Sequence, residues 1–394
     1  MLQVEVIQAP TKERLINRVM TEFKLQYGNE PDIVTLTPGR INIIGEHTDY
    51  NDGLAMPAAI DRWICATAYR SGNELSTIYS LNYKEGAVMS AHAMENYQEV
   101  WKRLAAASIR LIKTEFDIDE GVNMVLGGNI PIGCGLSSSS AFVISITQTV
   151  CQLLSIQMED RELAAFCQKI ENRALGTAGG LLDQYGIILS KKEHSLMIDF
   201  QDNSIEYLPL LLNRRSWLVV NSQIQRELSE SDYVQRVNEC KDGLEILKGK
   251  FDITGFRDID RKMLLELKMN HEVLYKRLCH VVDENDRVRE MKDQLVRGAA
   301  DRVGVLLRES HESLKSLYEV SCEEIDYIIE LSKNFDGWYG GRIIGGGFGG
   351  CSIHLVADHT VEDYQSHITV NYTKRYDIIP EILKVSFSGG LQSC

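Results

Sequence analysis

The stretch Thr37-Pro-Gly-Arg-Ile-Asn-Ile-Ile-Gly-Glu-His-Thr-Asp-Tyr-Asn-Asp-Gly53 gathers ionisable side chains at the end of a short apolar run, foremost Arg40, Glu46, His47 and Asp49. Ile41 and Ile43 are spaced to anchor one face of a strand, and Pro38-Gly39 and Gly45 predict turns beside it. Carboxylates accept hydrogen bonds from hydroxyls, and imidazole both donates and accepts. The stretch therefore fits either a site for a small polyhydroxylated ligand or a solvated loop with local ion pairs.

The composition is that of a globular protein of more than one domain. A chain of 394 residues exceeds one ordinary core, so two domains are expected. The formal net charge of −14 opposes non-specific binding to nucleic acid or to anionic membranes. A nucleotide could still bind where backbone N–H groups and a divalent cation neutralise its phosphates.

The cysteine pattern and the N-terminus favour a cytoplasmic protein. The nine cysteines are odd in number and form no Cys-x-x-Cys pair, which is typical of reduced thiols. The first ten residues lack the basic segment and long apolar run of a secretory signal. No apolar stretch reaches the roughly 18 residues of a membrane helix. We therefore expect a cytoplasmic enzyme or binding protein.

Apolar periodicity predicts a mixture of helices and strands. The predicted helices are 11–27, 97–114, 141–154 and 159–172, followed by a largely helical region over 232–334. The predicted strands are 63–69, 74–81, 122–126, 185–189 paired in a hairpin with 195–200, 217–221, 351–356 and 382–387. We place the domain boundary within 209–215.

A glycine- and serine-rich turn between a predicted strand and a predicted helix indicates a phosphate cradle. Its residues are Gly133, Gly135, Leu136, Ser137, Ser138, Ser139 and Ser140. Glycines let backbone N–H groups approach a ligand, and a helix N-terminus adds about half a positive charge. Serines also cap helices, which is the structural alternative. The turn matches neither a Walker A loop nor the Gly-x-Gly-x-x-Gly pattern.

Two further segments invite a functional interpretation. Asp183 follows a diglycine and two leucines, so it is either a turn residue or a positioned carboxylate. Five glycines in the six positions Gly345–Gly350 leave almost no side chain to pack. That composition predicts a close approach of the backbone to another element or to a ligand.

Together these segments resemble the three motifs of the GHMP kinase superfamily, and the resemblance spans nearly the whole chain. Gly39–Tyr50 is similar to the galactokinase signature for sugar binding, Pro131–Ala141 to the phosphate loop and Gly345–Cys351 to the third motif. The resemblance implies an α+β fold of two domains, ribosomal-protein-like over 1–212 and ferredoxin-like over 213–394. It also implies an active site in the cleft between the two domains.

The resemblance further implies transfer of the γ-phosphoryl group of ATP to the anomeric hydroxyl of galactose, with Mg²⁺. By position, Asp183 would be the catalytic base and Arg40 would orient it and stabilise charge. The sugar would be bound by Glu46, His47, Asp49, Tyr233 and the Gly180 backbone N–H. The phosphates would lie on the turn Gly133–Ser140, and the magnesium ligands would be Ser139 and Glu171. Sugar and ATP are the only partners that the resemblance implies.

Three positions depart from the usual galactokinase pattern. Gly179 stands where a cysteine is usual, Ile344 where a hydroxyl residue is common, and Ser140 where alanine is usual. The first and third of these resemble N-acetylgalactosamine kinases. The open alternatives are therefore a kinase for N-acetylgalactosamine or another aldose, and a sugar and ATP sensor without catalysis.

Two polar clusters carry no predicted site. His280–Asp286 and Lys191–His194 are charged and lack metal-ligand spacing, so they are expected to be solvated faces of a helix or a turn.

Overall fold

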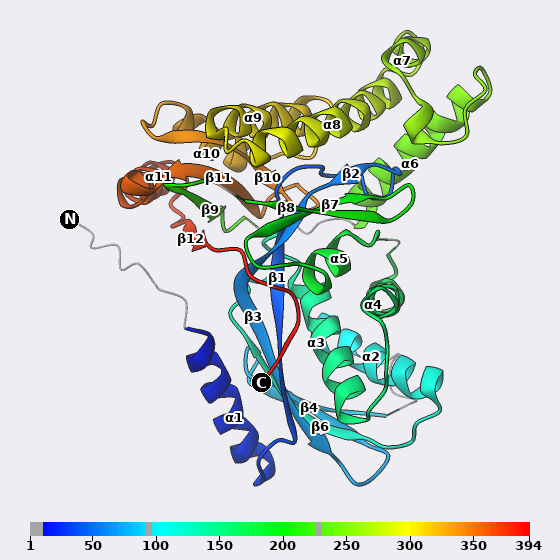
Figure 1. The fold of residues 1–394 in the computed structure, drawn as a ribbon, viewed down its shortest axis with the longest axis vertical. Helices are drawn as coiled ribbons and strands as arrows, with labels where there is room; N and C mark the ends of the chain where they lie inside the picture. The colour runs from blue at the N-terminus through cyan, green and yellow to red at the C-terminus, as the bar shows by residue number, and fades with distance from the viewer. Residues whose placement is uncertain (1–10, 91–96, 178, 211, 225–229) are drawn as a thin grey trace.

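The computed structural model describes residues 11–90, 97–177, 179–210, 212–224 and 230–394, and it has the expected α+β class (Figure 1). The first ten residues, on which the expectation about a secretory signal rests, lie outside the described residues. Three sheets are covered by helices, and the described residues contain no helix that is both long and apolar enough to span a membrane. The boundary between residues 212 and 213 stays a prediction.

The first sheet has six strands in the order β13-β1-β3-β6-β4-β5. They are β1 (Ile33–Asn42), β3 (Pro57–Arg70), β4 (Ser76–Ser80), β5 (Glu85–Met89), β6 (Val122–Gly128) and β13 (Gln392–Ser393). The β4–β6 pair is parallel, and the other neighbours are antiparallel. Strand β1 is central to the site because its end carries the charged stretch.

Helices cover both faces of this sheet. On one side lie α2 (Val100–Phe116), α3 (Ser138–Leu153), α4 (Asp160–Leu175) and α5 (Leu182–Ile188), and α1 (Lys12–Tyr27) lies on the other side (Figure 1). The predicted helix over 11–27 is confirmed as α1, and Leu15, Val19 and Phe23 are its buried positions. They pack in a small core with Trp63 and Val125 of the sheet.

The second half of the chain contains an antiparallel sheet in the order β10-β11-β9-β12. Its strands are β9 (Arg215–Asn221), β10 (Trp338–Ile344), β11 (Cys351–Ala357) and β12 (Glu381–Val385). Its helices are α6 (Glu230–Lys248), η2 (Phe256–Asp258), α7 (Arg261–Lys268), α8 (Glu272–Val296), α9 (Ala300–Ser316), α10 (Glu323–Lys333), η3 (Asp358–Thr360) and α11 (Val361–Tyr376). The sequence patterns did not predict β10 or α11.

A small third sheet, β2-β7-β8, lies against α8 and joins the two halves. It consists of β2 (Leu54–Ala55), β7 (His194–Asp199) and β8 (Ser204–Pro209). The largest apolar core runs through this region, because Met56 and Ile198 share it with Val288 and Met291 of α8. The loop that follows β1 is therefore enclosed by both halves of the chain.

The predicted strand 185–189 is wrong. Residues 185–188 belong to α5 and Leu189 is its C-cap, while β7 forms its hairpin with β8 instead. A short apolar run fits a buried helix as well as a buried strand, and α5 packs closely on Pro57 through Gly186. The consequence for the site is that Asp183 lies in the first turn of a helix.

The predicted turn at Pro38-Gly39 is also wrong, because β1 runs through it. The strand register shifts between Pro38 and Arg40, so the irregularity is a β-bulge within the strand. Gly39 faces the phosphate-loop region, where an added Cβ would lie 3.1 Å from the Leu136 carbonyl oxygen. At the other end of the chain, the predicted strand 382–387 ends at Val385, and Phe387 forms only an isolated bridge with Ile60.

Candidate active site

Most of the residues singled out in the sequence line one cavity of about 240 Å³. The predicted residues among its lining are Arg40, Glu46, His47, Asp49, Glu171, Gly180, Asp183 and Tyr233. They come from the end of β1 and its loop, from α4, from the segment leading into α5, and from α6. Gly345 and Gly346 of the second glycine cluster complete the wall.

Arg40 connects the candidate base to the glycine- and serine-rich turn. Its side chain is buried, its Nε donates to Asp183 Oδ1 at 2.9 Å, and its Nη2 donates to the same oxygen. Its Nη1 donates to the Gly135 carbonyl oxygen at 2.6 Å. The Asp183 side chain is 31% exposed, so one carboxylate is held by a buried guanidinium and still faces the cavity.

A second carboxylate lies behind Asp183. The Ser140 hydroxyl lies 2.7 Å from Glu171 Oε2 and 3.3 Å from Asp183 Oδ2, so it sits between the two acids. Gln184 Nε2 also donates to Glu171, at 2.8 Å. Burial, followed by repulsion from Asp183, raises the pKa of Glu171 to about 7. Ser140, predicted as a phosphate contact, is buried and turned toward these acids.

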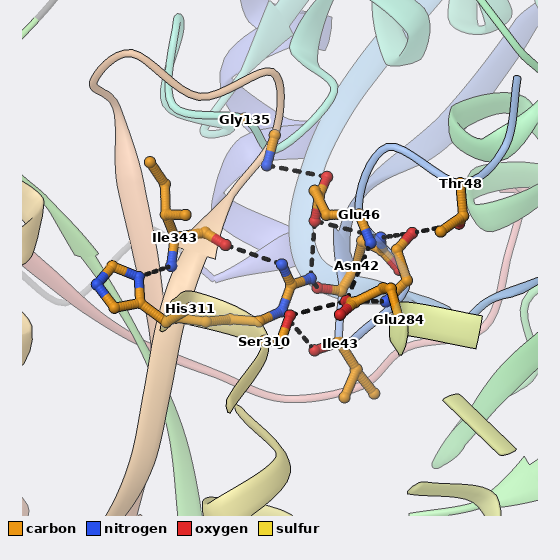
Figure 2. Close-up of polar contacts among 12 residues, drawn as sticks. Asn42, Ile43, Glu46, Thr48, Gly135, Glu284, Ser310, His311 and Ile343 are labelled. Atoms are coloured by element: carbon orange, nitrogen blue, oxygen red, sulfur yellow. Dashed lines mark hydrogen bonds and ion pairs between the residues drawn. The ribbon is translucent and has the colours of Figure 1, made fainter. Parts of the chain in front are cut away.

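Glu46 is buried in an ion pair that links the two halves of the chain. Its Oε2 accepts from Arg342 Nη2 at 2.7 Å and from Asn42 Nδ2 at 3.2 Å. Its Oε1 accepts from the Gly345 backbone N–H at 3.2 Å. Figure 2 shows Glu46 and Asn42 close to Glu284 of α8. A carboxylate has about four acceptor positions, so Glu46 retains capacity for one more donor in the cavity.

His47 is a neutral imidazole at the cavity wall. Burial, and then the neighbouring His280, lower its pKa to about 3. Its Nδ1 lies 2.8 Å from the Tyr50 hydroxyl, which lies 3.0 Å from the Tyr318 hydroxyl. Its Nε2 is buried and has no hydrogen-bond partner among the described residues. His47 lines the cavity, and its Nε2 is the ring nitrogen that the described residues leave unpaired.

Asp49 packs directly against the backbone of Gly180. A Cβ added at Gly180 would lie 3.0 Å from Asp49 Cγ and would overlap Oδ2, so a larger residue there requires the Asp49 side chain to shift. At Gly179 an added Cβ would meet only Asn172 Oδ1, at 3.4 Å. Burial, followed by repulsion from Asp183 and Glu46, raises the pKa of Asp49 to about 7.

The glycine- and serine-rich turn leads into the N-terminus of α3, as predicted. The N-cap residue Ser137 has a φ of 57° and makes no side-chain capping bond. The structural alternative of a serine cap is therefore wrong at this position, and the helix N-terminus keeps its donors for an anion. Gly133 and Gly135 have φ values of 73° and 67°, the left-handed region that favours glycine.

The two glycine-rich segments touch through their backbones. A Cβ at Gly345 would lie 2.8 Å from Gly135 Cα, and a Cβ at Gly135 would lie 3.0 Å from the Ile344 carbonyl oxygen. The predicted reason for the cluster, close approach of the backbone to another element, is thus confirmed for Gly345. This contact places a segment of the second half directly on the phosphate loop.

An apolar cavity of about 110 Å³ lies next to the phosphate loop, and sequence reasoning missed it. Tyr83 and Trp101 stack beside it with ring centroids 5.5 Å apart, and Ser138 and Ser139 line its edge. Ser80 and Asn82 add polar groups. These residues come from β4, the turn after it and α2, so only the tertiary fold brings them to Ser139. A flat apolar ring is the ligand group that such a cavity accepts best.

The expectation that His280–Asp286 is a solvated face is wrong for three of its residues. His280, Glu284 and Asn285 are buried, and each bonds the loop that follows β1. The helix that contains them has charged residues along most of its length. A sequence pattern of this kind does not distinguish a polar face that is buried from one that is exposed to solvent. Lys191 and Lys192 are exposed, as expected.

The donor atoms around Glu171 fit a magnesium ion. The Glu171 carboxylate and the Ser139 hydroxyl are hard oxygen ligands, the kind that Mg²⁺ prefers. Burial and the nearby Asp183 carboxylate raise the pKa of Glu171, and a cation bound to its oxygens would favour the ionised form. The described residues contain no cluster of three His, Cys, Asp or Glu side chains suited to a metal. That is compatible with Mg²⁺, which binds through one or two protein groups plus water and phosphate.

Comparison with protein families gives three matches along the chain. Residues 21–70 match the galactokinase galactose-binding signature, 100–191 the GHMP kinases N-terminal domain and 291–364 the GHMP kinases C-terminal domain. The galactokinase of Staphylococcus saprophyticus is 30% identical over 385 residues, covering 96% of this chain and 100% of that protein. The galactokinase of Thermosipho africanus is 34% identical over 354 residues, covering 90% and 97%.

Solved structures give the same relationship. The crystal structure of Lactococcus lactis galactokinase complexed with galactose superposes with a TM-score of 0.90 at 28% identity, covering 95% of this chain and 99% of that one. A mevalonate kinase structure, at 19% identity and a TM-score of 0.64, shares the fold. The two-domain GHMP kinase fold that the sequence motifs implied is confirmed.

The glycine pair beside Asp49 gives a test of this geometry. We expect Gly180→Ala to lower the free energy of unfolding by about 1–3 kcal/mol, because the new methyl group overlaps the Asp49 carboxylate. The matched variant Gly179→Ala meets no such overlap and should change stability by less than about 0.5 kcal/mol. Thermal unfolding followed by circular dichroism compares the two. Equal losses in both variants would contradict the packing of Asp49 on Gly180.

Proposed function

This chain belongs to the galactokinase family of the GHMP kinases, and on that premise we propose that it transfers the γ-phosphoryl group of ATP to the anomeric hydroxyl of galactose. The observation that carries the proposal is the Arg40–Asp183 pair, which lies between a hydroxyl-binding cavity and a phosphate loop. Phosphoryl transfer asks a protein mainly for positioning and charge neutralisation, and this pair joins the two binding regions.

Asp183 is the proposed base. It accepts the proton of the anomeric hydroxyl as that oxygen bonds to the γ-phosphorus, and the bond to the bridging oxygen of ADP breaks. Arg40 holds Asp183 through two nitrogens on one oxygen, which fixes the orientation of the carboxylate. The guanidinium also lies beside the phosphate loop, where it stabilises negative charge. Arg40 therefore orients the base and balances charge.

The residues proposed to bind the sugar all line the cavity. Glu46 and Asp49 accept hydrogen bonds from ring hydroxyls, and His47 uses its unpartnered Nε2. Tyr233 and the Gly180 backbone N–H lie on the same wall and supply further donors. The four carboxylates of this cavity suit a neutral polyhydroxylated ligand better than an anionic one.

The nucleotide lies across the phosphate loop in this proposal. The backbone of Gly133–Ser140 and the N-terminus of α3 take the phosphates, and the apolar cavity beside Tyr83 and Trp101 takes the adenine. Ser139 and Glu171 would hold the magnesium ion. When bound, Mg²⁺ neutralises charge on the β- and γ-phosphoryl oxygens.

The alternatives are less well supported. The galactokinase galactose-binding signature and the curated galactokinase relatives favour galactose over N-acetylgalactosamine or another aldose. A sensor without catalysis would have no need of a buried arginine that orients a base. A cytoplasmic location, which the nine unpaired cysteines favour, stays a prediction.

A sugar panel tests the proposed function. We expect ATP- and magnesium-dependent phosphorylation of galactose to exceed that of N-acetylgalactosamine, glucose and mannose, because the hydroxyl-tuned wall rejects mismatched sugars. Coupled measurement of ADP release, with the sugar phosphate identified by mass spectrometry, provides the readout. Brisk turnover of another sugar without turnover of galactose would refute the assignment.

The role of Asp183 is tested by Asp183→Asn. The amide cannot accept the proton, so kcat should fall by about two to four orders of magnitude. Binding of galactose and ATP, measured by calorimetry, should persist because the variant keeps the size of the side chain. If kcat stayed near the wild-type value, Asp183 would not be the base.

Galactose affinity should depend on pH through Asp49. Sugar hydroxyls that donate to this carboxylate favour its ionised form, so binding should release protons and the Kd should fall as pH rises through the Asp49 pKa of about 7. Calorimetry in two buffers of different ionisation enthalpy measures the proton release. Asp49→Asn should bind more weakly with a flatter pH profile. A pH-independent Kd without proton release in the wild type would exclude this role of Asp49.

A further inference from the structure

One face of α8 is polar and yet enclosed. His280, Glu284 and Asn285 are spaced i, i+4 and i+5, so they lie on one side of the helix. His280 and Glu284 have no exposed surface, and Asn285 is 5% exposed. Other charged residues of the same helix, such as Asp286 and Arg289, form surface ion pairs. Burial of a polar group is costly unless it is hydrogen-bonded, so this face needs a specific partner.

The partner is the backbone of the loop that carries Glu46, His47 and Asp49. Glu284 Oε1 accepts from the Gly45 N–H at 3.0 Å and from the Glu46 N–H at 3.4 Å. His280 Nε2 lies 3.0 Å from the Glu46 carbonyl oxygen, so this nitrogen carries the proton and donates. Asn285 Oδ1 accepts from the Leu54 N–H at 2.7 Å. The three side chains thus hold both ends of the loop.

The loop needs such support because its backbone is strained. Gly45 has a φ of 89°, and an added Cβ would lie 2.6 Å from Ala55 Cα. His47, which is not glycine, has a φ of 61° in the left-handed region. Conformations of this kind persist only where the surroundings over-determine them. The hydrogen bonds from α8 to the backbone of Gly45 and Glu46 hold this part of the loop in its conformation.

Glu284 is held as a carboxylate in the interior. The Ser310 hydroxyl donates to its Oε1 at 2.7 Å, and Arg287 Nε donates to its Oε2 at 2.6 Å. Burial alone would raise its pKa, but the charge of Arg287, followed by His280, Arg342 and the Ser310 hydrogen bond, lowers it to about 2. Figure 2 shows Glu284 and Ser310 beside the segment that contains Asn42 and Ile43. The Glu284 carboxylate thus accepts four hydrogen bonds, from the Gly45 and Glu46 N–H groups, the Ser310 hydroxyl and Arg287. Both of its oxygens must therefore act as acceptors.

We propose that Glu284, assisted by His280 and Asn285, is a positioning residue that sets galactose affinity by fixing the loop that carries Glu46, His47 and Asp49. The proposal rests on the proposed function, because it assigns the sugar to that loop. Glu284 is not among the described residues that line the cavity, so it acts through the loop backbone. Its effect should fall on the sugar and spare the nucleotide, which binds on the opposite side of Asp183.

The central test is Glu284→Gln. This substitution replaces one carboxylate oxygen by an NH₂ group, which is a donor. The NH₂ group must face either the loop N–H groups of Gly45 and Glu46 or the Arg287 guanidinium. These groups are donors too, so at least one hydrogen bond is lost in either orientation. We expect the KM for galactose to rise about tenfold or more, with the KM for ATP unchanged within about twofold. Steady-state kinetics are normalised to the folded fraction, which is measured by thermal unfolding.

A second substitution should restore the affinity. In the double variant Glu284→Gln/Arg287→Gln, the amide carbonyl introduced at position 287 can accept from the NH₂ group introduced at position 284. The carbonyl oxygen of the amide at position 284 is then free to accept from the loop. The KM for galactose should therefore return toward the wild-type value. A KM for galactose that stayed raised in the folded double variant would contradict a donor mismatch at the loop as the cause.

Two controls separate loop positioning from general damage. Ser310→Ala removes a donor to Glu284 and leaves both loop bonds, so it should lower the melting temperature with little change in the KM for galactose. Asp286→Asn makes the same chemical change on the exposed face of α8 and should leave both quantities unchanged.

The outcomes distinguish this proposal from the proposed function. If the wild type does not phosphorylate galactose, the proposed function itself fails. If the wild type is active and the KM for galactose in the folded Glu284→Gln protein stays within about twofold, the positioning role is overturned. An equal rise of KM in Ser310→Ala would also overturn it, because that variant keeps the loop bonds.

Discussion

The buried guanidinium of Arg342 is the interaction on which the site depends. Arg342 has no exposed surface and donates to the carbonyl oxygens of Asn42 and Ile43, at 2.5 and 2.8 Å, and to Glu46. It therefore ties β10 of the second half to the point where the chain leaves β1. A buried ion pair adds little net stability compared with apolar packing, but loss of one partner leaves an unpaired charge. The main effect of Arg342 is therefore to fix the position of Glu46 and of the chain at the end of β1, and its contribution to stability is small.

The charge distribution of the cavity follows from that geometry. Glu46, Asp49, Glu171 and Asp183 face one space, and two buried arginines hold Glu46 and Asp183. Burial and mutual repulsion raise the pKa values of Asp49 and Glu171 to about 7, so both acids lie near the point of protonation at neutral pH. The hydroxyl groups of a neutral sugar can donate hydrogen bonds to Asp49 and Glu171, and a bound cation would offset their negative charge. This charge distribution supports the proposal that the cavity takes a polar ligand together with Mg²⁺.

Sequence reasoning recovered the parts of the site that depend on local chemistry. Glycines at Gly133, Gly135 and Gly345 mark backbone conformations and contacts that other residues cannot adopt, and the structure confirms them. Asp183 lines the cavity as the sequence predicts, but the residues after it form a helix where the sequence predicts a strand. A short apolar run is compatible with either period. The missed parts depend on contacts between distant segments. Trp101 and Tyr83 become a cavity wall only when α2 lies across the sheet, and Glu284 meets Gly45 across 239 positions of sequence.

The return of the chain from β12 to β13 restricts how the cavity can admit its ligands. After the second sheet, the Ser386 carbonyl oxygen accepts from the Asp61 N–H, and the Ser388 and Gly390 N–H groups donate to the carbonyl oxygens of Ala59 and Ser190, all within 2.9 Å. The chain thus crosses between the two halves near residues 209–215 and again at 386–391. A swinging motion of one half against the other would therefore have to bend the chain at both crossings. The two crossings thus limit how far the halves can separate around the cavity that both of them line.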